Sequence, residues 1–92
     1  MDVQITPSAV EAFKMDYEDN PEMGFRLYLA DKSWVGPRIR LVLDEPEDED
    51  KILVIDGINV YYKHEVTILA KSLIIDYKTS FFKKKFFVER IK

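Results

Sequence analysis

The chain has 92 residues, of which 47% are hydrophobic and 34% charged, and its formal net charge is -3. These values fit one folded domain over residues 1–92 and argue against intrinsic disorder and against a strongly basic nucleic-acid-binding protein. The lack of cysteine excludes disulfides, thiol nucleophiles and thiolate metal sites. No signal peptide or membrane-spanning run is visible, so we expect a cytoplasmic protein without membrane contact.

The first predicted elements are a short strand at residues 3–5 and a helix directly after it. Thr6 suits the N-cap of this helix, and Pro7 suits its first position. The apolar face recurs with the helical period, at Val10, Phe13 and Tyr17. Asn20 followed by Pro21 ends the helix, because the residue before proline is pushed away from helical angles.

Two segments that alternate between apolar and polar residues predict half-buried strands. They are FRLYLA at residues 25–30 and RIRLVLD at residues 38–44. The stretch between them, DKSWVGP at residues 31–37, is predicted as a loop and carries the chain's only tryptophan.

The second half of the chain predicts mostly strands. Residues 52–62 favour a hairpin around Asp56-Gly57, because both positions of a type I′ turn need a positive φ. A short helix over 63–71, a strand over 72–78 and a last strand over 86–91 are expected to follow. This order predicts an α+β fold with a largely antiparallel sheet, without βαβ repeats.

Six motifs follow one another along the chain: ITPSAVEAFK, GFRLYLA, a loop ending in GP, LVLDEP, IDGINV and IIDY. Their order resembles that of the HesB-like family, which includes the A-type iron–sulfur cluster assembly carriers, and the resemblance spans the chain from Val3 to about Val88. The resemblance implies a compact domain with a twisted, mainly antiparallel, barrel-like sheet. It also implies one N-terminal helix and one short later helix packed on that sheet.

The residues that hold a cluster in this family are missing. The resemblance implies a cysteine in the loop at residues 31–37, at or next to Trp34, and two more in a C-terminal tail that has no counterpart here. Where relatives tend to have glycine near the C-terminal segment, this chain has Lys83, Lys84 and Lys85. Because one histidine and no thiols cannot supply four ligands to a soft cluster, we expect no cofactor and no metal.

Two parts of the sequence are candidate partner contacts. Trp34 either covers the end of the sheet as core or contacts a partner or ligand. The aromatic and basic tail SFFKKKFFVERIK is either an edge strand protected by lysines or a contact for an acidic partner, another copy, a nucleic acid or a membrane. We favour a protein partner because the net charge is negative. The candidate contacts are Trp34, Gly36, Pro37, Lys83, Lys84 and Lys85.

The acidic turn and the single histidine are predicted to be surface features without a catalytic role. The acidic turn comprises Asp44, Glu45, Glu47, Asp48, Glu49 and Asp50. It could attract a hard cation, but Pro46 interrupts the EF-hand pattern, so we predict a solvated loop. His64 is expected at the surface or at a helix start, and no catalytic residue is predicted.

Three functions remain in competition. The preferred one is a non-catalytic binding or regulatory module, associated by resemblance with iron–sulfur cluster biogenesis and possessing no cluster ligands. The second is a metal or cluster transfer component that uses ligands supplied by a partner. The third is an enzyme with an unrecognised site, for which no constellation is visible in the sequence.

Overall fold

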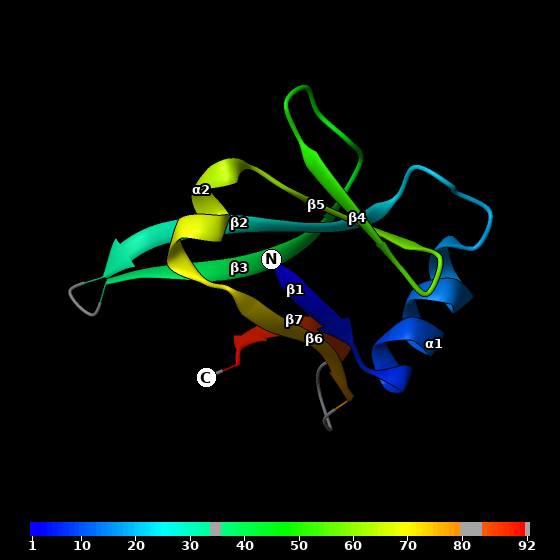
Figure 1. The fold of residues 1–92 in the computed structure, drawn as a ribbon. Coiled ribbons are helices and arrows are strands. Elements are labelled where there is room, and N and C mark those ends of the chain that lie inside the picture. Colours follow the sequence, from blue (N-terminus) through cyan, green and yellow to red (C-terminus); the bar gives the residue numbers. More distant parts are fainter. Residues whose placement is uncertain (34–35, 80–83, 92) are drawn as a thin grey trace.

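The computed structural model describes residues 1–33, 36–79 and 84–91, which form two helices and seven strands (Figure 1). The helices are α1 (Pro7–Tyr17) and α2 (His64–Leu69). The strands are β1 (Asp2–Ile5), β2 (Gly24–Ser33), β3 (Gly36–Asp44), β4 (Lys51–Ile55), β5 (Ile58–Tyr62), β6 (Ser72–Thr79) and β7 (Lys84–Arg90). No helix in the described ranges is long and apolar enough to cross a bilayer.

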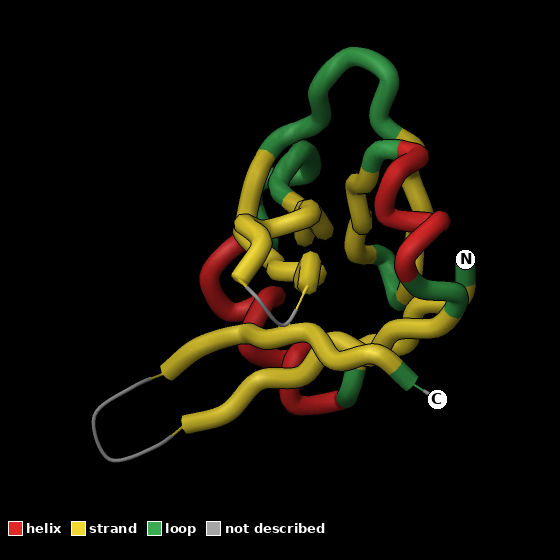
Figure 2. The backbone as a smooth tube through the Cα atoms, turned by 90° about the vertical axis from the view of Figure 1, so that its left-hand side faces the viewer, coloured by secondary structure: helices red, strands yellow, loops and turns green. Residues whose placement is uncertain are grey.

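The strands form two mixed sheets, with the orders β1-β6-β7 and β3-β2-β5-β4. The pairs β2–β3, β4–β5 and β6–β7 are antiparallel, whereas β1–β6 and β2–β5 are parallel. The α+β class and the predominance of antiparallel pairs are therefore confirmed. The expected barrel-like sheet is divided in two and does not close into a barrel. Figure 2 shows the β6–β7 hairpin, whose second strand leads to the C-terminal end, extending away from the body.

The edges of the two sheets approach each other on both sides of the domain. On one side β1 contacts β4, and on the other side β3 contacts β7. In the part of the chain that the structure describes, neither contact is a hydrogen-bonded strand pair. We call the second contact the β3–β7 seam.

The start of α1 follows the sequence prediction. The backbone N–H of Ala9 donates to Oγ1 of Thr6 (3.2 Å), which makes Thr6 the N-cap, and Pro7 is the first helical residue. The helix ends at Tyr17, earlier than the Asn20-Pro21 signal indicated. A turn in which the N–H of Asn20 donates to the carbonyl of Tyr17 (3.0 Å) replaces the last expected helical residues.

The core lies between the inner faces of the two sheets and is closed by α1. Phe25 of β2 is fully buried and contacts Phe13 of α1 and Phe86 of β7, with ring centroids 5.0 and 4.9 Å apart. The fully buried set also includes Leu27, Ile58, Val60, Val66, Leu73 and Ile75. These are the inward positions of alternating strands together with the inner face of α2, as the sequence patterns predicted.

The hairpin between β4 and β5 is confirmed in detail. Asp56 has a φ of 53° and Gly57 a φ of 80°, so both turn residues adopt the left-handed region that a type I′ turn requires. The short helix after it is confirmed as α2, where Val66 is buried and His64 is the exposed first residue.

The predicted loop at residues 31–37 is mostly strand. The antiparallel pairing of β2 with β3 continues to Ser33 and Gly36, with an irregular register between Ala30 and Ser33. The prediction was wrong here because the hydrogen-bonded ladder extends past the apolar alternation, and a bulge absorbs the change of register. Trp34 and Val35 lie outside the described residues.

Candidate functional site

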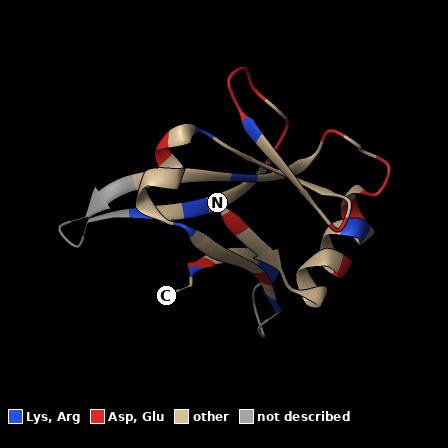
Figure 3. Cartoon of the chain, in the orientation of Figure 1, with Lys and Arg blue, Asp and Glu red and all other residues tan. Residues whose placement is uncertain are grey.

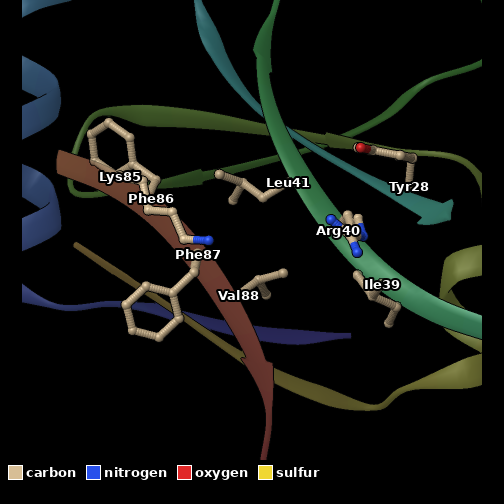
Figure 4. Close-up of a pocket in the computed structure, with 8 residues that line it drawn as sticks. All are labelled: Tyr28, Ile39, Arg40, Leu41, Lys85, Phe86, Phe87 and Val88. Atoms are coloured by element: carbon tan, nitrogen blue, oxygen red, sulfur yellow. The ribbon is translucent and has the colours of Figure 1, made fainter. Parts of the chain in front are cut away.

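A groove follows the β3–β7 seam, where each strand is the outermost of its sheet (Figure 4). One hollow of about 260 Å³ is lined by Tyr28, Ile39, Arg40, Leu41, Lys85, Phe86, Phe87 and Val88. A second hollow of about 250 Å³ is lined by Arg38, Ile39, Leu73, Val88, Glu89 and Arg90. Because Ile39 and Val88 line both hollows, the two form one continuous depression along the seam.

The groove has an apolar floor and a charged rim. Strand alternation turns Ile39 and Leu41 of β3 toward the core, where they are half-buried and pack on the buried cluster. Phe86 and Val88 of β7 do the same from the other sheet. The rim carries four exposed cations and one exposed anion, namely Arg38, Arg40, Lys85, Arg90 and Glu89.

The aromatic residues of β7 are held in fixed places. The ring of Phe86 packs against Phe25 and Tyr77, at centroid distances of 4.9 and 4.7 Å. Phe87 is on the opposite face of its sheet, where Nζ of Lys78 lies 4.9 Å from the ring centroid. Phe86 is thus a packed part of the groove floor, and it anchors β7 to the core.

The structure places one of the sequence-predicted contact residues, Lys85, in the groove. Lys84 and Lys85 are exposed on β7, and Lys85 lines the groove. Gly36 and Pro37 begin β3, the strand that forms the facing wall. Trp34 and Lys83 lie outside the described residues, so their part in a contact stays a prediction.

The cations of β3 were not among the sequence-predicted contacts. Arg38 and Arg40 alternate with Ile39 in RIRLVLD, and this alternation was the available signal. What the sequence did not reveal was that β3 and β7 adjoin, because they belong to different sheets and far separated parts of the chain.

A second cluster of charges surrounds Arg26 of β2, whose side chain is nearly buried. Its Nε donates to Asp44 Oδ2 (2.7 Å), and Nη1 and Nη2 donate to Oδ1 and Oδ2 of Asp50 (2.8 and 2.7 Å). Its Nη2 also donates to the carbonyl of Glu45 (2.9 Å). The guanidinium lies 5.8 Å from the ring centroid of Tyr61. Arg26 therefore ties the acidic turn to the face of the four-stranded sheet.

Lys63 completes this cluster from the start of α2. Its Nζ donates to Asp50 Oδ1 (2.8 Å) and to the carbonyl of Asp48 (2.7 Å). The N–H of Glu47 donates to Asp50 Oδ2 (2.7 Å), so both oxygens of that carboxylate have two donors. We call Arg26, Asp44, Asp50 and Lys63 the Arg26 network.

The Arg26 network corrects the prediction of a fully solvated acidic turn. The side chain of Asp50 is only 1% exposed, whereas Glu45, Asp48 and Glu49 are exposed. The acidic residues of this turn are coloured red in Figure 3. Hydrogen bonds from Arg26 lower the pKa values of Asp50 and Asp44 below their usual range. The bond to Asp50 likewise raises the pKa of Arg26.

The Arg26 network also occupies the oxygens that a hard cation would need. Arg26 and Lys63 satisfy both oxygens of Asp50, and Arg26 binds one oxygen of Asp44. Across residues 1–30, 38–79 and 84–91, no three His, Asp or Glu side chains are grouped so as to hold a metal ion. The acidic turn is therefore an ion-pair cluster in this fold.

The fold is shared with known iron–sulfur proteins. No family model matches the sequence, and no curated protein matches it. The crystal structure of Escherichia coli SufA, a protein involved in biosynthesis of iron–sulfur clusters, matches with a TM-score of 0.79 and 19% identity over 97% of this chain and 80% of that chain. The crystal structure of IscA with the [2Fe-2S] cluster matches with a TM-score of 0.66 and 20% identity, over 96% of this chain and 81% of that chain. The solution NMR structure of a protein from Aquifex aeolicus matches with a TM-score of 0.66 and 20% identity, over 97% of this chain and 91% of that chain.

These likenesses confirm the fold that the family resemblance implied, but the side chains do not fit a cluster. Iron–sulfur clusters are held by cysteine thiolates, in some centres with histidine. The whole sequence has no cysteine, and its single histidine, His64, is exposed at the start of α2. This chain alone therefore does not provide the ligand set.

Proposed function

We propose that this chain is a non-catalytic binding module that takes part in iron–sulfur cluster biogenesis through a protein partner and holds no cluster itself. The observation that carries the proposal is a SufA-like fold over 97% of a chain that has no cysteine. A domain that keeps this fold without the thiolates can still offer its surface. The groove along the β3–β7 seam is the surface best suited to that role.

The titratable groups of the described chain support a non-catalytic role. Groups with perturbed pKa values often mark active sites. Here the perturbed groups belong to the Arg26 network, apart from Asp76, whose pKa is lowered by a hydrogen bond from Thr6. Thr6 Oγ1 donates to Asp76 Oδ1 at 2.7 Å and joins the start of α1 to β6. These perturbations are explained by ion pairing in the Arg26 network and by hydrogen bonding to Asp76.

The first test is anaerobic reconstitution with ferrous iron and sulfide, with Escherichia coli SufA treated in parallel. After desalting, we expect visible absorption and bound iron in SufA and a colourless, metal-free protein here. A brown protein with stoichiometric iron and sulfide would overturn the claim that this chain holds no cluster.

The second test asks whether the chain acts in the pathway. Its binding to purified cluster assembly proteins from its own source is measured, together with its effect on the rate of cluster transfer to an acceptor apoprotein. We expect binding to at least one of these proteins. The absence of both binding and any rate effect would refute the proposal. Iron and sulfide retained only by a complex would show that the partner supplies the ligands.

A further inference from the structure

We propose that the β3–β7 groove binds an extended acidic segment of the partner protein, with apolar side chains between its carboxylates. This inference deepens the proposed function and rests on it for the pathway to which the partner belongs. The chemistry of the segment is argued from the groove alone.

The charge of the rim selects an acidic occupant. Arg38 and Arg40 project from β3, and Lys85 and Arg90 from β7, against a single acidic side chain, Glu89. The cations therefore flank the groove from both walls. A partner of opposite charge would be attracted at long range and aligned on contact.

The acidic groups of the chain itself are arranged elsewhere. Asp44 and Asp50 are bound by Arg26 and Lys63, on the acidic turn that follows the end of β3. Figure 3 shows the acidic turn separated from the basic residues of the seam. The acidic turn therefore does not neutralise the cations of the groove, and a segment from outside the described part of this chain can supply the acidic groups that pair with them.

The strands beside the groove favour an extended backbone. β3 and β7 are outermost in their sheets, so each has one strand edge without a hydrogen-bonded neighbour in the described structure. Such edges pair readily with an added strand, and many peptide-binding domains use them in this way. Because Cα atoms of β3 and β7 come within 8 Å of each other at the seam, no strand fits between them, and the segment pairs with only one of the two edges beside this contact. Cations on an edge discourage pairing with another basic strand, but they permit an acidic one.

The two hollows provide places for apolar side chains. Both lie along the seam and share Ile39 and Val88, and Leu41 and Val88 extend into the space between the strands (Figure 4). In an extended segment, alternate side chains point to the same side. A segment that alternates acidic and apolar residues can therefore direct its apolar residues to the floor and its carboxylates to the rim.

The test begins with a displayed library of random strand-length peptides selected against the immobilised intact protein. We expect the enriched peptides to be rich in Asp and Glu with interspersed apolar residues. No enrichment, or enrichment of neutral or basic peptides, would overturn the inference. A fluorescently labelled consensus peptide then provides a binding assay by anisotropy.

The binding assay uses matched charge reversals. Arg40→Glu combined with Lys85→Glu should lower the affinity for the consensus peptide about tenfold or more, because the double change places negative charges on both sides of an acidic segment. Lys14→Glu combined with Lys51→Glu changes the net charge equally at exposed sites on α1 and on β4, the sheet edge opposite β3, and should leave affinity within about twofold. Equal weakening in both double variants would show that only overall charge matters and would overturn the site.

Backbone amide exchange locates the peptide and checks its conformation. With wild-type protein, the peptide should slow exchange at the amides of β3 or β7, as expected for an added strand. Slowed exchange confined to α1 or to the acidic turn would refute the groove as the site. Unchanged thermal unfolding of both double variants verifies that their folds are intact. Because the probe is a selected peptide, this result is independent of whether the cluster assembly proteins bind.

Discussion

Replacing Arg26 by methionine tests whether the Arg26 network holds the acidic turn on the sheet. The change keeps much of the apolar length of the side chain but removes its hydrogen bonds to Asp44, Asp50 and the carbonyl of Glu45. Asp50 then remains as a carboxylate whose side chain is 1% exposed. Leaving one member of a buried ion pair unpartnered costs about 3–5 kcal/mol.

The expected loss lies at the lower end of that range, at about 3 kcal/mol, because Asp50 keeps its donors from Lys63 and the N–H of Glu47. A domain of 92 residues has a free energy of unfolding of roughly 5–14 kcal/mol. Arg26→Met should therefore remove a large share of the stability. Its melting temperature should fall by about 12–24 °C, since each kcal/mol corresponds to about 4–8 °C in a domain of this size.

The assay is urea unfolding followed by far-ultraviolet circular dichroism, with Arg40→Met as the matched control. Arg40 is exposed on the neighbouring strand, and its replacement should change the free energy of unfolding by less than about 0.5 kcal/mol. Adding Asp50→Asn to Arg26→Met should restore part of the loss, because the buried charge is gone. Equal effects of Arg26→Met and Arg40→Met, or strictly additive effects of the two changes in the double variant, would refute the reasoning.

Three further predictions concern stability. The pKa of Asp50 in the folded protein lies below its unfolded value of about 3.9. The stability that its ionised form contributes is therefore fully present above about pH 4 and is lost as the pH falls further. In Asp50→Asn, the free energy of unfolding should depend less on pH below about pH 4. A Cβ on Gly24 would collide with the backbone of β5, so Gly24→Ala should lower the free energy of unfolding by about 1–3 kcal/mol in urea melts. A Cβ on Gly57 would meet no atom, so Gly57→Ala should lower the free energy of unfolding by only about 1 kcal/mol, the strain of an alanine at positive φ. A larger loss for Gly57→Ala than for Gly24→Ala would contradict this account. Thr6→Ala removes both the N-cap and the hydrogen bond to Asp76 and should cost about 2 kcal/mol, while Thr6→Ser retains both, which thermal unfolding of the two variants would check.

Local signals predicted the local elements well. The cap at Thr6 and Pro7 gave the start of α1, and Asp56-Gly57 gave the hairpin turn, because each depends on backbone preferences of neighbouring residues. The inward positions of β2, such as Phe25, followed from alternation and are buried as expected. The α+β class could be predicted from this order of elements.

The pairing of distant elements could not be predicted in the same way. Arg26 alternates with apolar residues as an exposed strand residue would, yet it is buried because the acidic turn folds back over it. Likewise, Arg40 and Lys85 meet at the groove only because two sheet edges adjoin. Both results depend on contacts between segments far apart in the sequence, for which residue spacing carries no signal.

The parallel pairing of β1 with β6 constrains the order in which the chain can fold. Asp2 is aligned with Ser72 and Ile5 with Ile75, so the first strand has its sheet partner near the other end of the sequence. The four-stranded sheet, in contrast, is contained within residues 24–62. That sheet can form before β1 has its partner, because β6 follows all four of its strands in the sequence. Such long loop closure favours slow folding, and the apolar side chains of β1 stay without their sheet partner until β6 is in place.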